Sequence, residues 1–416
     1  MNGTVHKVCV VGLGYIGLPT ASLLAIKGFQ VHGVDTNPNV VKLINDGGVH
    51  IFEPDLDIMV KAAVQSGKLR ASMEPEEADV FILAVPTPFT EHHKPDITYV
   101  RQATQTIISL LKPGNIVILE STSPVGTTEK IADWILEARN DLSLSDAPQS
   151  VCNRIFIAHC PERVMPGQIL RELVENDRVI GGIDHASTQR TTEFYKSFIN
   201  GKVLETNART AEMTKLTENS FRDVNIAFAN ELSVICDHLK INVWELIRLA
   251  NHHPRVSILQ PGPGVGGHCI AVDPWFLIDA APEQSKLIQT ARTVNNFKPG
   301  YIVDRVIEKA ERFKEPVIAC LGLSFKADIE DLRESPAVEI VKNLSARQIG
   351  KLNIVEPYVN QLPEFLQLEH TVLMGKEEAI RESDIVLLLV NHHAFSDIDR
   401  NLLKEKILID TRGFFN

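Results

Sequence analysis

The sequence predicts an α/β protein in which two doubly wound domains flank a central segment built on one long helix. Short β-rich runs alternate with helix-length segments over about the first 200 residues, the pattern of βαβ units around a parallel sheet. Beyond about Thr206 the alternation stops, and apolar residues recur at steps of three and four, which indicates an amphipathic helix. After Pro316 the alternation returns, which indicates a second α/β domain.

The first domain is expected to span residues 1–205 and to be Rossmann-like. Its strands are predicted where β-branched and other apolar residues cluster in short runs, at Val8–Val11, Val31–Val34, Val80–Val85, Ile116–Leu119 and Ile155–Ala158. Helices are predicted between these runs, at Ile16–Lys27, Tyr99–Leu111 and Glu129–Arg139.

The central segment is expected to span residues 206–313. Its long helix is predicted from a stripe of apolar residues at helical spacing: Met213, Leu216, Phe221, Val224, Phe228, Leu232, Ile235 and Leu239. Helices are also predicted at Val243–Ala250 and at about Glu283–Phe313, with a loop rich in proline and glycine between them. The last domain, residues 314–416, is expected to have strands at Val317–Leu321, Asn353–Val355, Ile385–Val390 and Ile407–Ile409.

Charge and hydropathy argue against two classes of partner. The net charge of the 416-residue chain is -11, and the sequence contains no run of lysine and arginine. Because an acidic surface repels phosphate backbones, nucleic acid is not expected as a partner. No stretch approaches the ~20 consecutive apolar residues that span a bilayer, so no membrane partner is expected either.

The cysteines and histidines indicate neither a disulfide framework nor a metal site. The six cysteines, at positions 9, 152, 160, 236, 269 and 320, are scattered and include no CxxC pair. This pattern favours free thiols in a reducing compartment, and therefore the cytoplasm. The His-His pairs that begin at positions 92, 252 and 392 lack the spaced partners of a metal site, so no metal is expected.

A glycine pattern after the first predicted strand indicates a dinucleotide-binding turn. The strand leads directly into residues 12–17, GLGYIG, and then into a helix. Gly12 permits the tight turn, Gly14 lets the backbone approach a pyrophosphate, and Gly17 allows the helix to pack closely on the strand.

Asp35, at the end of the second predicted strand, favours NAD over NADP. A carboxylate there accepts hydrogen bonds from a ribose diol and repels a 2′-phosphate. The pyrophosphate is expected on the amide groups where the first helix starts, around Tyr15 and Ile16. The alternative is a glycine turn that holds no cofactor, and the acidic residue weighs against it.

The most unusual segment is Pro261–Cys269, PGPGVGGHC. Its glycines let backbone amides come close to a ligand, and a thiol stands at its end. Asp273 follows soon after. A thiolate adds to an aldehyde, and a nearby base or ammonium group favours the thiolate form. The alternative, that Cys269 is simply a small buried side chain, is equally compatible with the sequence.

Lys215 and Asn219 are spaced i, i+4 on the predicted long helix. With Glu212, Arg222 and Asn230 they form a polar stripe opposite the apolar one. Most stripes of this kind face solvent. A stripe that lines a cleft supplies instead a cation and an amide to a developing oxyanion, and the spacing alone leaves both interpretations open.

Three loops with polar side chains follow predicted strands of the first domain. Val85–Pro88 contains Thr87, Glu120–Pro124 contains Thr122, and His159–Arg163 contains Glu162. Because the carboxyl ends of parallel strands share one edge of the sheet, these side chains are expected near the cofactor. The alternative is that they only form turns beside proline.

Together these segments resemble the nucleotide-sugar 6-dehydrogenases, the family that includes UDP-glucose and GDP-mannose dehydrogenases. The likeness extends over essentially the whole chain. Within the family, Ala211–Ser233 and Pro261–Phe276 are most similar to the bacterial branch that acts on UDP-N-acetyl-D-mannosamine, and Glu120–Lys130 and Cys160–Gly167 agree with it.

The resemblance implies an NAD-binding domain, a central segment that forms a homodimer through its long helix, and a C-terminal domain that binds the UDP-sugar. It also implies a four-electron oxidation that uses two NAD and passes through a thiohemiacetal and a thioester on Cys269. By the same analogy Lys215 and Asn219 steady oxyanions, Asp273 assists proton movement or the water, and Glu162 with Thr122 positions the hydrolytic water.

The resemblance also assigns binding residues. The cofactor is expected at Gly12, Gly14, Tyr15, Ile16, Gly17, Asp35, Thr87, Thr122 and Arg333. The UDP-linked N-acetylhexosamine is expected at Arg163, Val164, Lys215, Asn219, Arg255, Gly266 and Lys326. One departure matters: the glucose-type enzymes carry a second glutamate where this chain has Pro166, which favours a different hexose.

Three alternatives stay open at the level of sequence. The same chemistry on UDP-N-acetylglucosamine or UDP-N-acetylgalactosamine uses the same glycine-rich cysteine loop. A two-electron 3-hydroxyacid dehydrogenase also joins a Rossmann domain to a helical one and uses a Lys-x-x-x-Asn pair, but leaves Cys269 without a role. A catalytically silent NAD-binding regulator leaves the thiol, the lysine and the glycine loop unexplained.

Overall fold

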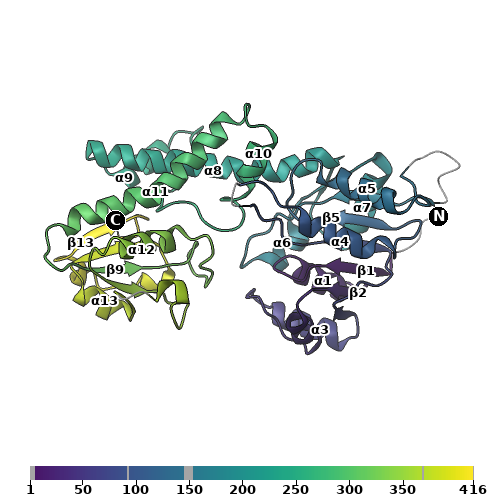
Figure 1. Ribbon diagram of the computed structural model, residues 1–416, viewed down its shortest axis with the longest axis horizontal. Coiled ribbons are helices and arrows are strands. Elements are labelled where there is room, and N and C mark those ends of the chain that lie inside the picture. The colour runs from purple at the N-terminus through teal and green to yellow at the C-terminus, as the bar shows by residue number, and fades with distance from the viewer. Residues whose placement is uncertain (1–4, 91–92, 145–152, 368–369, 416) are drawn as a thin grey trace. The chain divides into compact units, whose positions relative to one another are not determined.

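The computed structural model describes residues 5–90, 93–144, 153–367 and 370–415 (Figure 1). His92 and Cys152 lie outside the described residues. The chain divides into two compact units, residues 1–217 and 218–416. The predicted domain limits at 205 and 313 stay a prediction.

The first unit contains a doubly wound sheet, as predicted. Among the described residues its strands lie in the order β3-β2-β1-β4-β5-β6-β7-β8, and every neighbouring pair is parallel except β6 with β7. The strands are β1 (Lys7–Val11), β2 (Gln30–Val34), β3 (Leu69–Ser72), β4 (Val80–Leu83), β5 (Ile116–Leu119), β6 (Phe156–His159), β7 (Arg178–Gly182) and β8 (Val203–Asn207). The helices are α1 (Gly17–Ile26), α2 (Pro38–Asn45), α3 (Leu56–Gln65), α4 (Thr98–Ile108), α5 (Thr127–Ala138), α6 (Ile169–Glu175) and α7 (His185–Lys196).

Helices cover both faces of this sheet, so its central strands are apolar on both sides. In β1, Val8 and Val10 pack in one core cluster with residues of α1, α3, α6 and α7. Cys9 and Val11, which point to the opposite face, pack in a second cluster with residues of α4 and α5. The strands have continuous apolar runs in the sequence because both of their faces are buried.

Three strands of the first unit were not predicted. β3 (LRAS) and β8 (VLETN) lie at the two edges of the sheet and carry polar residues that obscure a strand pattern. β7 (RVIGG) starts with arginine and ends in two glycines, which are poor strand formers in isolation, although all five residues are buried. Tertiary burial outweighs local propensity at this strand.

The long helix is α8 (Ala208–Leu239), close to the predicted element. It is followed by α9 (Val243–Ala250), α10 (Asp273–Ala280) and α11 (Lys286–Ala310), of which α10 was not predicted. Buried polar contacts join α8 to α11: Arg292 pairs with Asp223 at 2.7 Å, and the amide of Asn230 donates to Asn295 Oδ1 at 2.9 Å.

The polar stripe of α8 is the side that makes contacts, whereas much of the apolar stripe is exposed. Glu212, Asn219 and Asn230 are all buried. By contrast, the apolar residues Met213, Phe221, Phe228, Ile235 and Leu239 are exposed. The interpretation that the polar stripe faces solvent is therefore wrong for its buried members, and holds for Arg222, which is exposed.

The C-terminal sheet is parallel throughout the described strands, in the order β11-β10-β9-β12-β13. Ile318 and Cys320 of β9 pack with residues of α11 and α12, and Ala319 and Leu321 pack with residues of α13 on the other face. The elements are β9 (Val317–Leu321), α12 (Pro336–Ala346), β10 (Lys351–Val355), β11 (Thr371–Leu373), α13 (Lys376–Glu382), β12 (Ile385–Leu388) and β13 (Ile407–Asp410).

None of the described helices combines the length and the apolar character that a membrane-spanning helix needs. Within the described residues, no three His, Cys, Asp or Glu side chains lie together as ligands for one metal ion.

Candidate active site

The glycine turn after β1 has the backbone that a pyrophosphate requires. Gly12 has φ +94°, and a Cβ there would lie 2.5 Å from the carbonyl oxygen of Ala84. A Cβ on Gly17 would lie 1.7 Å from the carbonyl oxygen of Gly12, so neither position admits a side chain. The described residues leave the Cβ position of Gly14 open, which permits close approach of a ligand to the backbone.

The carboxylate of Asp35 lies directly beside this turn. Its Oδ2 accepts from the N–H of Leu13 at 3.1 Å, and its Oδ1 accepts from the N–H of Asn37 at 2.9 Å. Ile16 is the N-cap of α1, and Tyr15 is exposed just before it. The turn, the helix start and the acid thus fit the pyrophosphate and the ribose of a dinucleotide.

Two hydroxyl-bearing loops meet where β4 and β5 end. Thr87 Oγ1 donates to the carbonyl oxygen of Thr122, and Ser121 Oγ donates to the carbonyl oxygen of Val85 at 2.7 Å. Both threonines are half-buried. The structure therefore brings Thr87 and Thr122 together at the carboxyl edge of the sheet, where the sequence predicted them.

Glu162 follows β6 at the same edge and is buried. Its N–H donates to the carbonyl oxygen of Glu120 at 3.4 Å, and its carboxylate accepts from the N–H of Val164. Burial raises the pKa of Glu162 to about 7, although the charges of Lys215 and Arg178 act in the lowering direction. A carboxyl group that titrates near neutral pH is suited to general acid–base chemistry.

The first turns of α8 contact these loops. Lys215 is half-buried, and its positive charge acts to lower the pKa of Glu162. One turn earlier, the buried carboxylate of Glu212 accepts from the N–H groups of Gly126 at 2.6 Å and Thr128 at 2.7 Å. Glu212 thereby fastens the segment after Thr122 to the helix that carries Lys215.

In the second unit, Asn219 of α8 contacts the segment that follows Cys269. Its Nδ2 donates to Oδ2 of Asp273 at 2.5 Å, and both side chains are buried. Asp273 begins α10, and its N–H donates to the carbonyl oxygen of Cys269 at 2.8 Å. Cys269 is exposed, so the alternative of a small buried side chain is wrong.

Two glycines of the loop before Cys269 lie close against neighbouring segments. A Cβ on Gly262 would lie 2.6 Å from a guanidinium nitrogen of Arg412, and one on Gly266 would lie 2.3 Å from the carbonyl oxygen of Glu334. The N–H of Gly267 donates to that same oxygen at 3.3 Å. The N–H of Gly262 donates to Oδ1 of Asn230 at 2.8 Å, which fastens the loop to α8.

The loop that follows β9 carries Lys326 and Arg333, and both are exposed. Arg333 forms a two-point ion pair with Asp331, at 2.8 and 2.7 Å. The carbonyl oxygen of Lys326 accepts from Ser324 Oγ at 2.6 Å. The predicted contact of Lys326 with substrate and that of Arg333 with cofactor phosphates stay predictions.

The remaining predicted substrate residues lie in two loops of different units. Arg163 and Val164 directly follow Glu162, and Arg163 Nη1 donates to the carbonyl oxygen of Asp177 at 3.0 Å. Arg255 is exposed in the turn after α9, and its N–H donates to Nδ1 of His253 at 3.3 Å. Among the described contacts, those of Arg255 join no other predicted site residue.

The C-terminal domain repeats an arrangement of the first unit, in which a glycine follows one strand and a carboxylate follows the next. The contacts of the carboxylate differ between the two. Gly322 follows β9 with φ +89°, and Glu356 follows β10 and accepts from the N–H of Leu323 at 2.6 Å. Unlike Asp35, however, Glu356 is buried, and its carboxylate also contacts His392 Nε2 at 3.1 Å. Because groups of the protein already contact this carboxylate, Glu356 is poorly suited to bind a ribose as Asp35 is expected to do.

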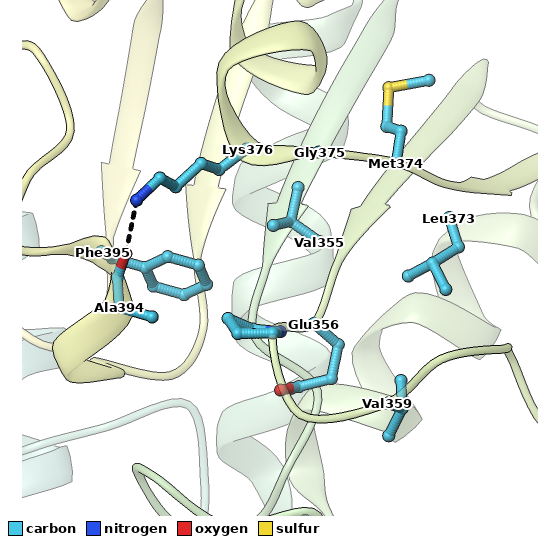
Figure 2. Close-up of a pocket in the computed structure, with 10 residues that line it drawn as sticks. Val355, Glu356, Val359, Leu373, Met374, Gly375, Lys376, Ala394 and Phe395 are labelled. Atoms are coloured by element: carbon cyan, nitrogen blue, oxygen red, sulfur yellow. Dashed lines mark hydrogen bonds between the residues drawn. The ribbon is translucent and has the colours of Figure 1, made fainter.

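A pocket of about 330 Å³ opens beside Glu356 at the ends of β10 and β11 (Figure 2). Lys376 lies at its rim, and its Nζ donates to the carbonyl oxygen of Ala394 at 2.8 Å. The lining includes neither Lys326 nor Arg333 among the described residues. Lys326 and Arg333, which were predicted to bind substrate and cofactor, therefore do not line this pocket.

Sequence reasoning missed two polar residues of the candidate site. Arg412 lies against Gly262 of the thiol loop, and desolvation lowers its pKa to about 10. Its position directly after β13 is the clue that was available, because strand ends bind ligands in such sheets. Glu53 is buried and accepts from the N–H groups of Gly167 and Ile169, both at 2.7 Å, and nothing in its sequence context distinguishes it.

Three family descriptions match the chain in order. They are the NAD binding domain of the UDP-glucose/GDP-mannose dehydrogenase family over residues 6–199, the central domain over residues 209–297, and the UDP binding domain over residues 319–416.

Full-length relatives and a solved structure are also similar. A Ralstonia nicotianae protein named NDP-N-acetyl-D-galactosaminuronic acid dehydrogenase is 57% identical, over 99% of this chain and 96% of its own length. A Campylobacter jejuni protein named UDP-N-acetyl-D-mannosamine dehydrogenase is 55% identical, over 94% of this chain and 97% of its own. The structure of a UDP-D-ManNAc dehydrogenase from Pyrococcus horikoshii has a TM-score of 0.88 at 37% identity, covering 99% of this chain and 96% of that one.

Proposed function

The chain belongs to the UDP-glucose/GDP-mannose dehydrogenase family, and from this premise we propose that it oxidises the C6 alcohol of UDP-N-acetyl-D-mannosamine to a carboxylate with NAD. One observation carries the proposal. The thiol of Cys269 is exposed at the end of a glycine loop, one turn before an Asp273 carboxylate that is held by Asn219. A two-electron dehydrogenase has no use for such a nucleophile.

The NAD-binding family description and the fit of the glycine turn support NAD as the cofactor. The residues proposed to hold it are Gly12, Gly14, Tyr15, Ile16, Gly17, Asp35, Thr87, Thr122 and Arg333. When bound by these residues, NAD would supply the hydride acceptor for both oxidations, that of the alcohol and that of the thiohemiacetal, which corresponds to two NAD for each sugar.

The thiolate of Cys269 is proposed to add to the aldehyde carbon and form a thiohemiacetal, whose oxidation leaves a thioester. Water then adds to the thioester carbon, the carbon–sulfur bond breaks, and the sulfur regains a proton as the carboxylate forms. The Lys215 ammonium and the Asn219 amide stabilise the oxyanions that develop on the sugar oxygen. Glu162, with Thr122, takes the proton of the hydrolytic water, and Asp273 assists proton movement near the sulfur.

The sugar nucleotide is proposed to bind at Arg163, Val164, Lys215, Asn219, Arg255, Gly266 and Lys326. The family description of a UDP binding domain over residues 319–416 supports a nucleotide-sugar substrate. We place the domain limits at 1–205, 206–313 and 314–416. A cytoplasmic location is also proposed, because a thiol nucleophile has to stay reduced.

A second hexosamine is favoured by a specific observation. The Ralstonia relative, at 57% identity, is named for an N-acetylgalactosaminuronic acid rather than for N-acetylmannosamine. The family resemblance is confirmed by the three matching descriptions, whereas the epimer rests on relatives that differ in their names. UDP-N-acetylgalactosamine is therefore the second candidate substrate.

The purified protein is expected to reduce two NAD for each UDP-N-acetyl-D-mannosamine consumed. The measurement compares NADH absorbance with sugar acid quantified by chromatography, for UDP-linked N-acetylmannosamine, N-acetylgalactosamine, N-acetylglucosamine and glucose. A ratio of one NADH per sugar contradicts the four-electron chemistry. If two NADH form per sugar only with the UDP-linked N-acetylgalactosamine or N-acetylglucosamine, the four-electron chemistry is supported and the choice of epimer is wrong.

The exposed apolar face of α8 supports a homodimer. Phe221 is 67% exposed, Phe228 49% and Ile235 46%, and their seven-residue spacing places them on one side of the helix. Large exposed aromatic side chains along one face are typical of an interface. We propose a second copy of this chain as the partner, because a self-complementary helix face generates a closed dimer.

Phe228→Asp is expected to convert the dimer to a monomer, because a carboxylate buried in an apolar interface is left without a partner. Sedimentation velocity at low micromolar concentration measures the change. The matched control is Phe365→Asp, at a phenylalanine of the C-terminal domain with the same 49% exposure. A Phe228→Asp protein that stays folded by circular dichroism and sediments as the wild type argues against this interface.

A further inference from the structure

A buried carboxylate from a distant part of the chain holds the loop between β6 and α6, residues 160–168. Glu53 lies in the connection between α2 and α3 and is only 6% exposed. Its Oε2 accepts from the N–H of Gly167, and its Oε1 accepts from the N–H of Ile169, both at 2.7 Å. Each oxygen of this carboxylate therefore satisfies one backbone donor, 114 or 116 residues later in the chain.

The segment that Glu53 holds is a tight turn, Met165–Gln168. The N–H of Gln168 donates to the carbonyl oxygen of Met165 at 3.0 Å, and Gly167 has φ +90°. Proline at the second position and a glycine with positive φ at the third are typical of a type II turn. Among the described residues, no neighbouring segment comes within 4 Å of the Cβ position of Gly167. The positive φ, and not a lack of space, therefore favours glycine here.

The other carboxylates that hold this loop lie close to it in the sequence. The N–H of Met165 donates to Oε2 of Glu172 at 2.7 Å, and the N–H of Val164 donates to the carboxylate of Glu162. The two acceptors are seven and two residues from their donors. Among the described hydrogen bonds of the turn, those to Glu53 are the ones that join it to a distant segment.

Both sides of the Glu53 contact are anchored by apolar packing. Ile51, two residues before Glu53, lies in the same core cluster as Ile169, and Val164 packs against that cluster. The turn itself, Met165–Gln168, is exposed. The carboxylate thus joins an exposed turn to a buried and well-packed part of the first unit.

We propose that Glu53 is a positioning residue for the sugar nucleotide: by holding the turn, it keeps Arg163 and Val164 in the conformation that binds the substrate. The inference rests on the proposed function, which assigns Arg163 and Val164 to the sugar nucleotide. These two residues directly precede the turn, so a displaced turn moves them as well. Glu53 itself acts through the loop and is not assigned a contact with the substrate.

Glu53→Gln is expected to raise KM for the sugar nucleotide by about tenfold, while kcat stays within about threefold of the wild type. An amide oxygen accepts from one of the two N–H groups, but an amide nitrogen accepts from neither, so one charge-assisted hydrogen bond is lost. KM for NAD is expected to change by less than about twofold, because Asp35 is held by other hydrogen bonds. Initial rates of NADH formation by the full-length enzyme give all three constants.

Hydrogen exchange measured by mass spectrometry tests the positioning without any substrate. In the free Glu53→Gln protein, amides in a peptide that covers residues 163–170 are expected to exchange about tenfold faster than in the wild type. Faster exchange together with a raised KM supports the positioning role. A merely structural role predicts a lower melting temperature with an unchanged KM.

Asp79→Asn is the matched control. Asp79 also accepts from two backbone N–H groups of a distant segment, those of His6 at 2.8 Å and Lys7 at 2.9 Å. These contacts lie at the start of β1 and just before β4, so they are at the opposite edge of the sheet from the loop that Glu53 holds. Asp79→Asn is expected to retain the wild-type KM and the wild-type exchange of residues 163–170.

A folded Glu53→Gln protein with the wild-type KM, or with wild-type exchange of residues 163–170, overturns the proposal. Gly167→Ala supplies a second and independent perturbation, because a side chain disfavours the positive φ of this exposed turn. It is expected to raise KM in the same direction, and it decides the matter if Glu53→Gln does not fold. A wild-type KM in Gly167→Ala then overturns the proposal.

A failure of the proposed function gives a different result. A wild-type enzyme that produces one NADH per sugar, or that oxidises no UDP-sugar, contradicts the proposed function, and this result is obtained before any variant is measured.

Discussion

Cys269→Ser is expected to lower kcat for sugar-acid formation by about 10³-fold or more. A serine hydroxyl is a far weaker nucleophile than a thiolate near neutral pH. An ester is also less readily formed and cleaved than a thioester. Steady-state NADH production with the preferred UDP-sugar measures the loss. Trapping of residual aldehyde with a hydroxylamine reagent shows whether the first oxidation continues.

Cys236→Ser is the matched control, because Cys236 is a buried cysteine on α8 that is not assigned to the site. It is expected to retain activity within about threefold. If Cys269→Ser keeps more than a tenth of the wild-type rate and still releases two NADH per sugar, Cys269 is not the nucleophile and a hydrated aldehyde is the second substrate.

Glu162→Gln is expected to separate oxidation from hydrolysis. An amide cannot take a proton from water, so kcat is expected to fall by about 10²- to 10⁴-fold while both oxidation steps continue. A rapid burst of two NADH per active site should precede a slow steady rate. Intact-protein mass spectrometry should then detect the sugar acid bound as a thioester.

The pH dependence of the wild type follows from the same carboxyl group. Because the pKa of Glu162 is raised to about 7, chiefly by burial, the fraction in the basic form increases as the pH rises through neutrality. Hydrolysis is therefore expected to accelerate between about pH 6 and pH 8, and this limb should be absent in Glu162→Gln.

Glu175→Gln is the control for that substitution, since Glu175 is an exposed carboxylate of α6 that pairs with Arg171 at 2.6 Å. It is expected to show the wild-type profile. An unchanged steady rate in Glu162→Gln, with no burst, assigns the hydrolytic base to another group, of which Asp273 is the first to examine.

Local patterns in the sequence were sufficient to predict the elements whose conformation depends mainly on residues close in the chain. The glycine turn at 12–17 was predicted from the spacing of its glycines after a strand. The structure leaves no room for a side chain at Gly12 or at Gly17. The buried parallel strands were predicted because helices on both faces demand continuous apolar runs. Asp35 was predicted from its place after a strand.

Other features depended on contacts between distant segments. The spacing of Lys215 and Asn219 on α8 left open whether their stripe faces solvent, and the structure shows that Asn219 meets Asp273. Arg178 looks like an ordinary charged residue at the start of a strand, yet it is almost completely buried. Neither fact has a local signature, because burial of a polar side chain is decided by the partner that satisfies it.

The sequence by itself thus determined the buried central strands, the long helix and the dinucleotide turn, and it drew attention to the thiol of Cys269. Only the tertiary structure decided that this thiol is exposed, that Asp273 is held by Asn219, and that Arg178 is almost completely buried. The physical reason is that periodicity records which side of an element is apolar. Periodicity carries no information on which distant residue contacts the polar side. The electrostatics of a buried site depend on the identity and position of that residue.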